Sequence, residues 1–311
     1  MTASIWVLGE ALMDCLSQPD GTLRPFMGGS PYNMARAAAL RGAPAGYVNP
    51  LSTDRFGQQL GRQLQKDGVK VPAGESRLPT SLAVVQITEG QPSYGFYREG
   101  IADRDYTVDS VLTMLKAHPP GVLHTGSLLL VPPEHTKVVS ILQGAKDMGW
   151  TISVDVNLRP KLAADLGAYV EAVKKVAKLA DWIKASDEDL ELLGVQAPSR
   201  GKGRDIAAMF RDHGASRIAL TFGGDGAWLE VDGACAEADV PLTRVVDTVG
   251  AGDTFWGNCL GDWVLNANGQ QRVRQTLVEA MQAAAINCAR AGCQPPTYAE
   301  TQALLSGLNK A

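Results

Sequence analysis

Two aspartates lie on either side of a short run of small residues late in the chain. Asp247 comes shortly before Gly250-Ala251-Gly252, and Asp253 follows this run directly. Apolar residues then recur through 255–264 with the spacing of one helix face, so the small residues should form the turn that begins a helix. Unpaired N–H groups and the helix dipole favour an anion at such a turn. We therefore expect a phosphate site at Gly250, Ala251 and Gly252, and a catalytic carboxylate at Asp253.

An acid at this position also has a purely structural interpretation. Acidic side chains in the first turn of a helix stabilise the helix through its dipole, without any catalytic role. Asp247 favours catalysis over this alternative, because two acids around so short a turn exceed what capping requires.

A second polar segment stands near the start of the chain, where residues 28–35 are Gly-Gly-Ser-Pro-Tyr-Asn-Met-Ala. Gly28 and Gly29 would let the backbone approach a ligand closely, and Asn33 offers both a donor and an acceptor. An ordinary helix start after a glycine turn would explain this segment if it stood alone. A Gly-x-x-x-x-Gly-Lys-Ser/Thr loop is absent, and no Gly-x-Gly-x-x-Gly follows the first expected strand, which disfavours a dinucleotide dehydrogenase.

The composition is that of a globular protein with a substantial core. Of 311 residues, 45% are hydrophobic and 20% are charged, and the formal net charge is −4. This excludes a disordered chain and argues against nucleic acid or an anionic membrane as a partner. No apolar run reaches the ~18 residues of a membrane span. The first apolar stretch, at 5–8, is interrupted by Glu10 and Asp14, so a signal peptide is not expected.

Cysteine and histidine usage points to a reduced compartment. Five scattered cysteines without a Cys-x-x-Cys pattern are typical of reduced thiols, which indicates the cytoplasm. Four histidines without His-x-x-x-His spacing argue against a histidine-based zinc site.

Strand and helix patterns alternate along most of the chain. Strands are expected at 5–8, 47–50, 121–125, 151–155, 182–185 and 217–221, and helices at 33–40, 54–67, 132–148, 166–179 and 186–193. This alternation predicts an α/β protein with a mainly parallel sheet covered on both faces. The remaining expected elements are hairpins at 81–98 and 227–238, a flexible loop at 199–204, and helices at 252–265, 271–291 and 299–308.

Taken together, the two polar segments resemble the two signatures of the ribokinase-like carbohydrate kinases, the phosphofructokinase-B family. The signatures are Gly-Gly-x-x-x-Asn-x-Ala and Asp-Thr-x-Gly-Ala-Gly-Asp-x-Phe. Four further segments look like family motifs, so the resemblance covers nearly the whole chain: 9–14, 155–159, 221–226 and 283–292. It implies one ribokinase-like domain over residues 1–311, with a three-layer αβα core and a small β lid formed from segments about 10–30 and 80–105.

The resemblance also implies the residues of the site. The implied sugar-binding residues are Asp14, Gly28, Gly29, Asn33, Arg98 and Asp103. The implied ATP-binding residues are Asn157, Arg159, Lys184, Thr221, Gly223, Gly226 and Asn287. Asp253 would be the base that accepts the proton of the attacking hydroxymethyl group.

The metal ligands are implied in the same way, with two departures from the family pattern. Glu188 and Asp189 would join a magnesium network, and Asp247 a potassium site. Ser186 stands where the family has the asparagine of its Asn-x-x-Glu motif, and a helix cap at Ser186 is the alternative interpretation. Pro296 stands where a small polar residue is frequent near the potassium site.

Within the family, the segment 96–103 is most similar to the Tyr-Arg-x-x-x-Ala-Asp stretch of fructokinases, and 124–127 to their His-x-Gly-Ser. The 2-keto-3-deoxygluconate kinases commonly lack an acid at the position of Asp103. We therefore expect an ATP-dependent fructokinase that makes fructose 6-phosphate, with a 2-keto-3-deoxygluconate kinase as the main alternative. A ribose-type or nucleoside kinase fits the lid segment less well, and a non-catalytic sugar-binding regulator should lack Asp253. The resemblance also suggests a homodimer formed through the lid sheets.

Overall fold

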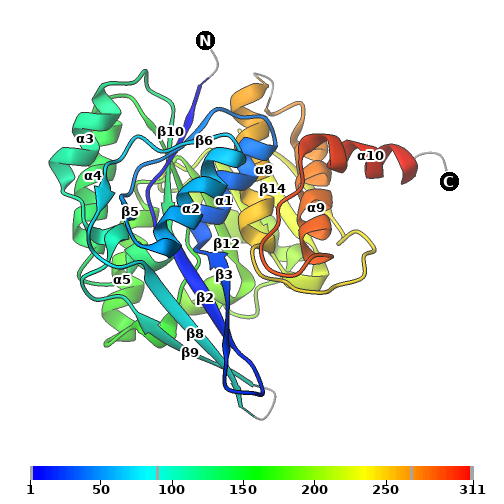
Figure 1. Cartoon of the computed structure of the whole chain (residues 1–311). Coiled ribbons are helices and arrows are strands. Elements are labelled where there is room, and N and C mark those ends of the chain that lie inside the picture. Colours follow the sequence, from blue (N-terminus) through cyan, green and yellow to red (C-terminus); the bar gives the residue numbers. More distant parts are fainter. Residues whose placement is uncertain (1–2, 89–90, 267–268, 309–311) are drawn as a thin grey trace.

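A nine-stranded sheet forms the centre of the computed structural model, which describes residues 3–88, 91–266 and 269–308 (Figure 1). Within these residues the strand order is β15-β14-β13-β12-β11-β10-β1-β4-β6. The strands are β1 (Ile5–Val7), β4 (Ala45–Tyr47), β6 (Val69–Lys70), β10 (Val122–Gly126), β11 (Thr151–Asp155), β12 (Trp182–Ser186), β13 (Arg217–Thr221), β14 (Ala227–Val231) and β15 (Ala234–Ala238). Neighbours from β6 through β13 pair in parallel, and β13, β14 and β15 pair antiparallel. The predicted mainly parallel sheet is confirmed.

Helices cover both faces of this sheet and complete the three predicted layers. One face packs against α1 (Ser30–Leu40), α2 (Arg55–Lys66), α8 (Ala251–Leu265) and α9 (Val273–Cys288). The other face packs against α3 (Val108–Lys116), α4 (His135–Asp147), α5 (Leu166–Ala177), α6 (Asp187–Leu192) and α7 (Gly203–Arg211). The last helix, α10 (Tyr298–Leu308), lies against α9. In the described part of the chain, none of these helices has the length and apolar character needed to cross a membrane.

A second sheet of four strands extends away from the core, at the bottom of Figure 1. Its order is β3-β2-β8-β9, and its strands are β2 (Leu12–Ser17), β3 (Leu23–Gly28), β8 (Ser81–Thr88) and β9 (Gln91–Tyr97). The predicted small sheet from two separate segments is therefore confirmed. Residues 89–90 of the hairpin expected at 81–98 lie outside the described residues.

The structure corrects several expected boundaries. The second core strand is Ala45–Tyr47 rather than 47–50, because Asn49 turns away to bond with the backbone N–H of Gly9 at 2.7 Å. Two helices were missed, α3 and α7. In α7, Ile206 and Phe210 are both buried at the i, i+4 spacing of one helix face. This short face was overlooked beside the charged loop at 199–204.

A buried charge cluster joins the helices that carry the site. Asp262 on α8 accepts hydrogen bonds from Arg41 Nη2 at 2.7 Å, Arg272 Nη2 at 2.9 Å and Thr276 Oγ1 at 2.6 Å. Arg41 stands at the end of α1, and Thr276 lies on α9. Burial acts to raise the pKa of Asp262, but the bonds from Arg272 and Thr276 and the arginine charges outweigh it and leave the pKa lowered.

Asp262→Asn is expected to lower the free energy of unfolding by about 3 kcal/mol, because it leaves Arg41 buried with weaker compensation. The folded pKa of Asp262 is lowered, so its charge stabilises the protein above the ordinary value of 3.8, and this contribution is lost as the pH falls through the folded pKa. Urea unfolding at several pH values measures the difference in the free energy of unfolding between wild type and Asp262→Asn. This difference should become smaller in acid. Asp232→Asn, at an exposed acid, is the control and should have a much smaller effect. Equal losses for the two variants would contradict this role for the cluster.

Candidate active site

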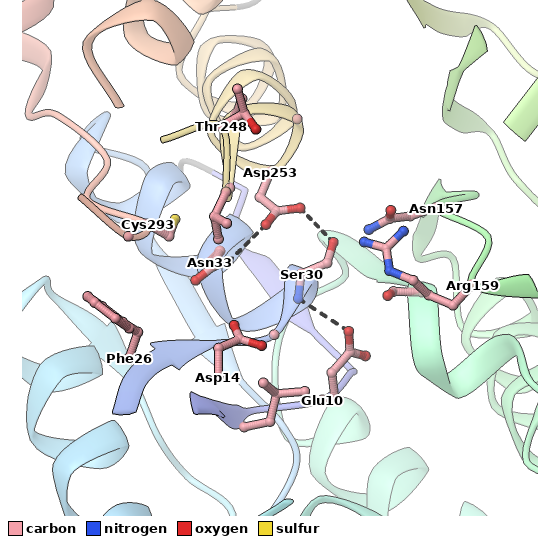
Figure 2. A pocket seen from close by; sticks show the side chains of 18 of the residues that line it. Glu10, Asp14, Phe26, Ser30, Asn33, Asn157, Arg159, Thr248, Asp253 and Cys293 are labelled. Carbon is pink, nitrogen blue, oxygen red and sulfur yellow. Dashed lines mark hydrogen bonds between the residues drawn. The ribbon is translucent and has the colours of Figure 1, made fainter. Parts of the chain in front are cut away.

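A cavity of about 830 Å³ opens between the four-stranded sheet and the start of α8 (Figure 2). It lies at the carboxyl ends of the parallel strands β11 and β12, where open α/β sheets bind ligands. Many of the residues predicted from the sequence line it: Asp14, Gly29, Asn33, Asn157, Arg159, Lys184, Glu188, Asp247, Gly250, Ala251, Gly252 and Asp253. The fold therefore gathers one set of residues from segments far apart in the chain.

The turn at the start of α8 is shaped to hold an anion. Gly250 has a φ of 74°, and an added Cβ there would lie 2.2 Å from Cys293 Sγ, so only glycine fits. No side chain among the described residues caps this helix start. A Cβ on Gly252 would lie 3.3 Å from Lys184 Nζ, which places an ammonium group beside the turn. Backbone N–H groups and a nearby positive charge together favour a phosphate.

Asp253 enters the cavity from the first turn of α8 and is held by α1. Ser30 Oγ donates to Asp253 Oδ1 at 2.7 Å, and Asn33 Nδ2 donates to Oδ2 at 2.9 Å (Figure 2). Burial raises the pKa of Asp253, although these two donors and the charges of Lys184 and Arg159 act in the opposite direction. A carboxylate in this setting is both fixed in orientation and raised in basicity.

Lys184 owes its position to a buried ion pair. Its Nζ donates to both oxygens of Asp155, at 2.9 and 3.1 Å, across the neighbouring strands β12 and β11. Burial raises the pKa of Asp155 to about 6 even though Lys184 opposes the shift. Burial acts to lower the pKa of Lys184, but Asp155 and other acids raise it on balance, so the lysine stays charged beside the turn.

Asp14 on β2 points into the cavity from the opposite side. A Cβ on Gly28 would lie 2.1 Å from Asp14 Oδ2, so Gly28 makes room for this carboxylate although it does not line the cavity itself. Burial raises the pKa of Asp14 to about 6, against the pull of Arg159. Asp14 and Asn33 together offer acceptors and donors suited to a polyhydroxylated ligand.

Arg98 and Asp103, which the resemblance implies as sugar contacts, do not line the cavity. Arg98 Nη1 donates to Asp103 Oδ2 at 3.1 Å and to Ser81 Oγ at 2.9 Å. Both charged side chains are buried, and neither lines the cavity. Burial raises the pKa of Asp103, with Arg98 opposing. Arg98 and Asp103 form a buried ion pair that joins the end of β9 to the following turn.

The expected nucleotide residues divide into two groups. Asn157, Arg159 and Lys184 line the cavity, whereas Thr221, Gly223 and Gly226 lie outside it, at the turn between β13 and β14. Asn287 does not line the cavity but supports the anion turn. Its Nδ2 donates to the carbonyl of Val249 at 2.8 Å, and its Oδ1 accepts from the N–H of Gln294 at 2.8 Å.

Of the expected metal ligands, Asp189 is already committed to the backbone. Its Oδ1 accepts from Leu158 N at 2.7 Å, and its Oδ2 accepts from the N–H and hydroxyl of Ser186, both at 2.8 Å. This capping box at α6 is the alternative that the serine in the motif suggested. Glu188 is exposed and lines the cavity.

Asp247 serves as a link between two loops. It accepts from Val249 N at 3.0 Å and from Gly292 N at 2.8 Å, which fixes the anion turn against the segment after α9. Among the described residues, no three or more His, Cys, Asp or Glu side chains come together as metal ligands do.

The cavity residues that sequence reasoning missed include Glu10, Phe26, Ser30 and Cys293. Glu10 stands in the segment 9–14 and Ser30 in the Gly-Gly-x-x-x-Asn-x-Ala signature, so their position was a signal that could have been used. Phe26 and Cys293 gave no signal, because they reach the cavity only through tertiary packing. A Cβ on Gly292 would lie 3.0 Å from the Phe26 ring, which shows how closely the four-stranded sheet approaches the segment after α9.

A helix start with free N–H groups, a buried carboxylate beside it and a polar cleft opposite are the features expected of a phosphotransferase that acts on a small hydroxylated molecule. Residues 2–300 match the pfkB family of carbohydrate kinases, and the chain belongs to this family. The predicted family, the ribokinase-like fold and the carbohydrate kinase activity are thereby confirmed.

Similar proteins include a fructokinase of Rhizobium leguminosarum bv. trifolii, 32% identical over 253 residues that cover 79% of this chain and 76% of the relative. A fructokinase of Escherichia coli is 28% identical over 82% of both chains. Among solved structures, a fructokinase with bound ATP from Xylella fastidiosa superimposes with a TM-score of 0.87 at 24% identity, covering 99% of this chain and 100% of the other.

Gly250→Ala is expected to destabilise the protein by about 1–2 kcal/mol from the left-handed backbone alone, and further through the contact with Cys293. Chemical unfolding measures this loss. Adding Cys293→Ala should recover only a share of the loss caused by the contact, since the sulfur is removed but the Cβ of residue 293 would still lie 2.7 Å from the added methyl group. Gly201→Ala, where nothing lies near the added Cβ, is the matched control. A Gly250→Ala variant as stable as this control would show that the turn tolerates a side chain.

Proposed function

We propose that this carbohydrate kinase transfers the γ-phosphate of ATP to the hydroxymethyl group of fructose, giving fructose 6-phosphate. The observation that carries the proposal is that one cavity is lined by the turn 250–252, the buried carboxylate of Asp253 and the polar side chains of Asp14 and Asn33. Similarity to proteins named fructokinase, over most of both chains, supports fructose as the sugar.

In the proposed reaction the sugar hydroxyl oxygen attacks the γ-phosphorus while its proton passes to Asp253. The bond between the γ-phosphorus and the β–γ bridging oxygen breaks, and ADP leaves with the electron pair. Charge develops on the transferred phosphoryl group, where the N–H groups at 250–252 and the Lys184 ammonium stabilise it. Asp253 must be ionised to accept the proton, so activity should fall in acid.

ATP would extend from the anion turn past Asn157 and Arg159. Thr221, Gly223 and Gly226 would hold its distal part beyond the cavity, and Asn287 would act by supporting the turn. These roles rest on the family resemblance and on the course of the cavity lining between β11 and α8.

Mg²⁺ is commonly bound through one or two carboxylates together with substrate phosphates. Glu188, exposed in the cavity, fits such a site, whereas the oxygens of Asp189 are already engaged. When bound, Mg²⁺ neutralises part of the phosphate charge. Asp247 is the proposed potassium ligand, and its place between the anion turn and Gly292 supports a role next to the phosphates.

Asp14, Gly29 and Asn33 are the proposed contacts to the sugar hydroxyls. Arg98 and Asp103 are proposed to hold the lid, because their ion pair lies outside the cavity. This arrangement disfavours 2-keto-3-deoxygluconate, since an arginine closed onto an acid is not offered to a substrate carboxylate.

The remaining proposals concern the whole protein. We infer that residues 1–311 work as one kinase domain, with the four-stranded sheet as a lid that excludes water, and that two copies pair through these sheets. All five cysteines are free, which supports a cytoplasmic location.

A substrate panel tests the proposed function. With saturating ATP, fructose should give a kcat/KM at least ~10-fold above those of 2-keto-3-deoxygluconate and ribose, because the polar groups of the cavity are arranged for its hydroxyls. A coupled assay of ADP release gives the rates, and NMR of the product identifies the phosphorylated carbon. Faster turnover of 2-keto-3-deoxygluconate would overturn fructose as the substrate and leave the kinase activity standing.

Asp253→Asn tests the base. It keeps the shape of the side chain and removes the proton acceptor, so kcat should fall by about 10²–10⁴. The melting temperature should change little, because the amide still offers one acceptor to α1. Near-normal kcat with a lowered melting temperature would mean that Asp253 only stabilises the helix.

A further inference from the structure

Three segments of the chain converge on one serine beside Asp253. Ser30 is the first residue of α1, and its hydroxyl donates to Asp253 Oδ1 at 2.7 Å. Its backbone N–H donates to Glu10 Oε1 at 3.2 Å, in the connection between β1 and β2. All three side chains are buried, with Glu10 only 1% exposed. Ser30 thus connects the carboxylate on α8 to an acid from the start of the chain (Figure 2).

The two donors on Asp253 divide its carboxylate between them. Asn33 takes Oδ2 and Ser30 takes Oδ1, and both donors belong to α1. With one donor the carboxylate could turn about its Cβ–Cγ bond, whereas a donor on each oxygen fixes its plane. Each oxygen keeps a second lone pair, so the incoming hydroxyl can approach only along the directions that remain.

Glu10 can hold Ser30 in place because the backbone around it is closely packed. A Cβ on Gly29 would lie 2.5 Å from the carbonyl oxygen of Glu10, so residue 29 rests directly on residue 10. The carboxylate of Glu10 then reaches the next N–H along the chain, that of Ser30. Burial raises the pKa of Glu10 to about 7, with Arg98 opposing, as expected for an enclosed acid.

We propose that Ser30 is a positioning residue for the catalytic carboxylate of Asp253, and that Glu10 acts through Ser30 by anchoring its backbone. This inference rests on the proposed function, because it takes Asp253 as the base. In this proposal Ser30 does not bind the sugar. Its hydroxyl keeps the carboxylate oriented and ionised until the substrate hydroxyl arrives.

Other charged and titratable groups also face Asp253, and they remain in place when Ser30 is altered. They are Lys184 on β12, Arg159 after β11, Asp155 on β11, Asp14 on β2 and the Cys293 thiol after α9. Burial raises the pKa of Asp253, and the Ser30 hydroxyl is the foremost group that lowers it again. Removing this hydroxyl should therefore raise the pKa further and move the acidic limb of the kcat profile to higher pH.

The test compares Ser30→Ala with wild type over a range of pH. A hydrogen bond to a charged group is strong enough that kcat should fall about 10- to 100-fold. The acidic limb should move to higher pH, and the KM for fructose should change less than kcat. Ser30→Thr keeps the hydroxyl, so the acidic limb of its kcat profile should lie at the same pH as in wild type. Ser52→Ala is the matched control, since Ser52 is also buried but bonds to Asp54 N away from the cavity.

A second measurement addresses Glu10. If Glu10 acts through Ser30, the double variant Glu10→Ala/Ser30→Ala should lose less activity than the product of the two single losses. An activity loss in the double variant equal to the product of the two single losses would overturn this part of the proposal. Melting temperatures identify any variant whose loss comes from unfolding.

The outcomes separate this inference from the proposed function. If Asp253→Asn is inactive while Ser30→Ala keeps its acidic limb unmoved, whatever its kcat, the positioning role is overturned and the base assignment stands. If Asp253→Asn retains normal kcat, the base assignment fails and the positioning role of Ser30 fails with it, whereas failure of the wild type to phosphorylate fructose would overturn the proposed function itself.

Discussion

The close contact between α1 and α8 is the constraint on which the site depends. A Cβ on Gly257 would lie 2.7 Å from the Cβ of Ala37, and one on Gly261 would lie 2.8 Å from Cγ of Arg41, so glycines on α8 allow the two helices to approach. This approach brings the first turn of α1 within hydrogen-bonding distance of Asp253. The charge cluster around Asp262 holds the other end of the same helix pair. A loosening of this contact would therefore disturb the hydrogen bonds that hold Asp253.

The cavity contains both acidic and basic side chains, and their charges partly offset one another. Asp14 and Asp253 face each other across the space proposed for the sugar, and their mutual repulsion contributes to a raised pKa for Asp14. Lys184 and Arg159 counter this negative charge from the side of β11 and β12. Asp155 balances Lys184 beneath the anion turn. Lys184 and Arg159 thus offset part of the negative charge that Asp14 and Asp253 bring into the cavity.

Several motif residues hold the backbone around the site through hydrogen bonds. Asn287 donates to the carbonyl of Val249, Asp247 accepts from the N–H of Gly292, and Asp189 accepts from the N–H of Leu158, next to Asn157. A motif therefore marks a residue that matters to the site without showing whether the residue touches the ligand. Only contacts distinguish the two cases, because the same carboxylate can accept from a backbone N–H or from a substrate.

Local patterns in the sequence determined the alternation of strands and helices, the parallel sheet, and the glycine turn at the start of α8. These features follow from periodicity and from backbone conformations that few residues can adopt, and both are visible within short windows. Tertiary structure decided which partners the polar side chains found. Ser30 bonds to Asp253 across 223 positions of the chain, and Arg98 turns to Asp103 instead of the cavity. Such choices depend on how closely distant elements pack, since a hydrogen bond forms or fails over a few tenths of an ångström.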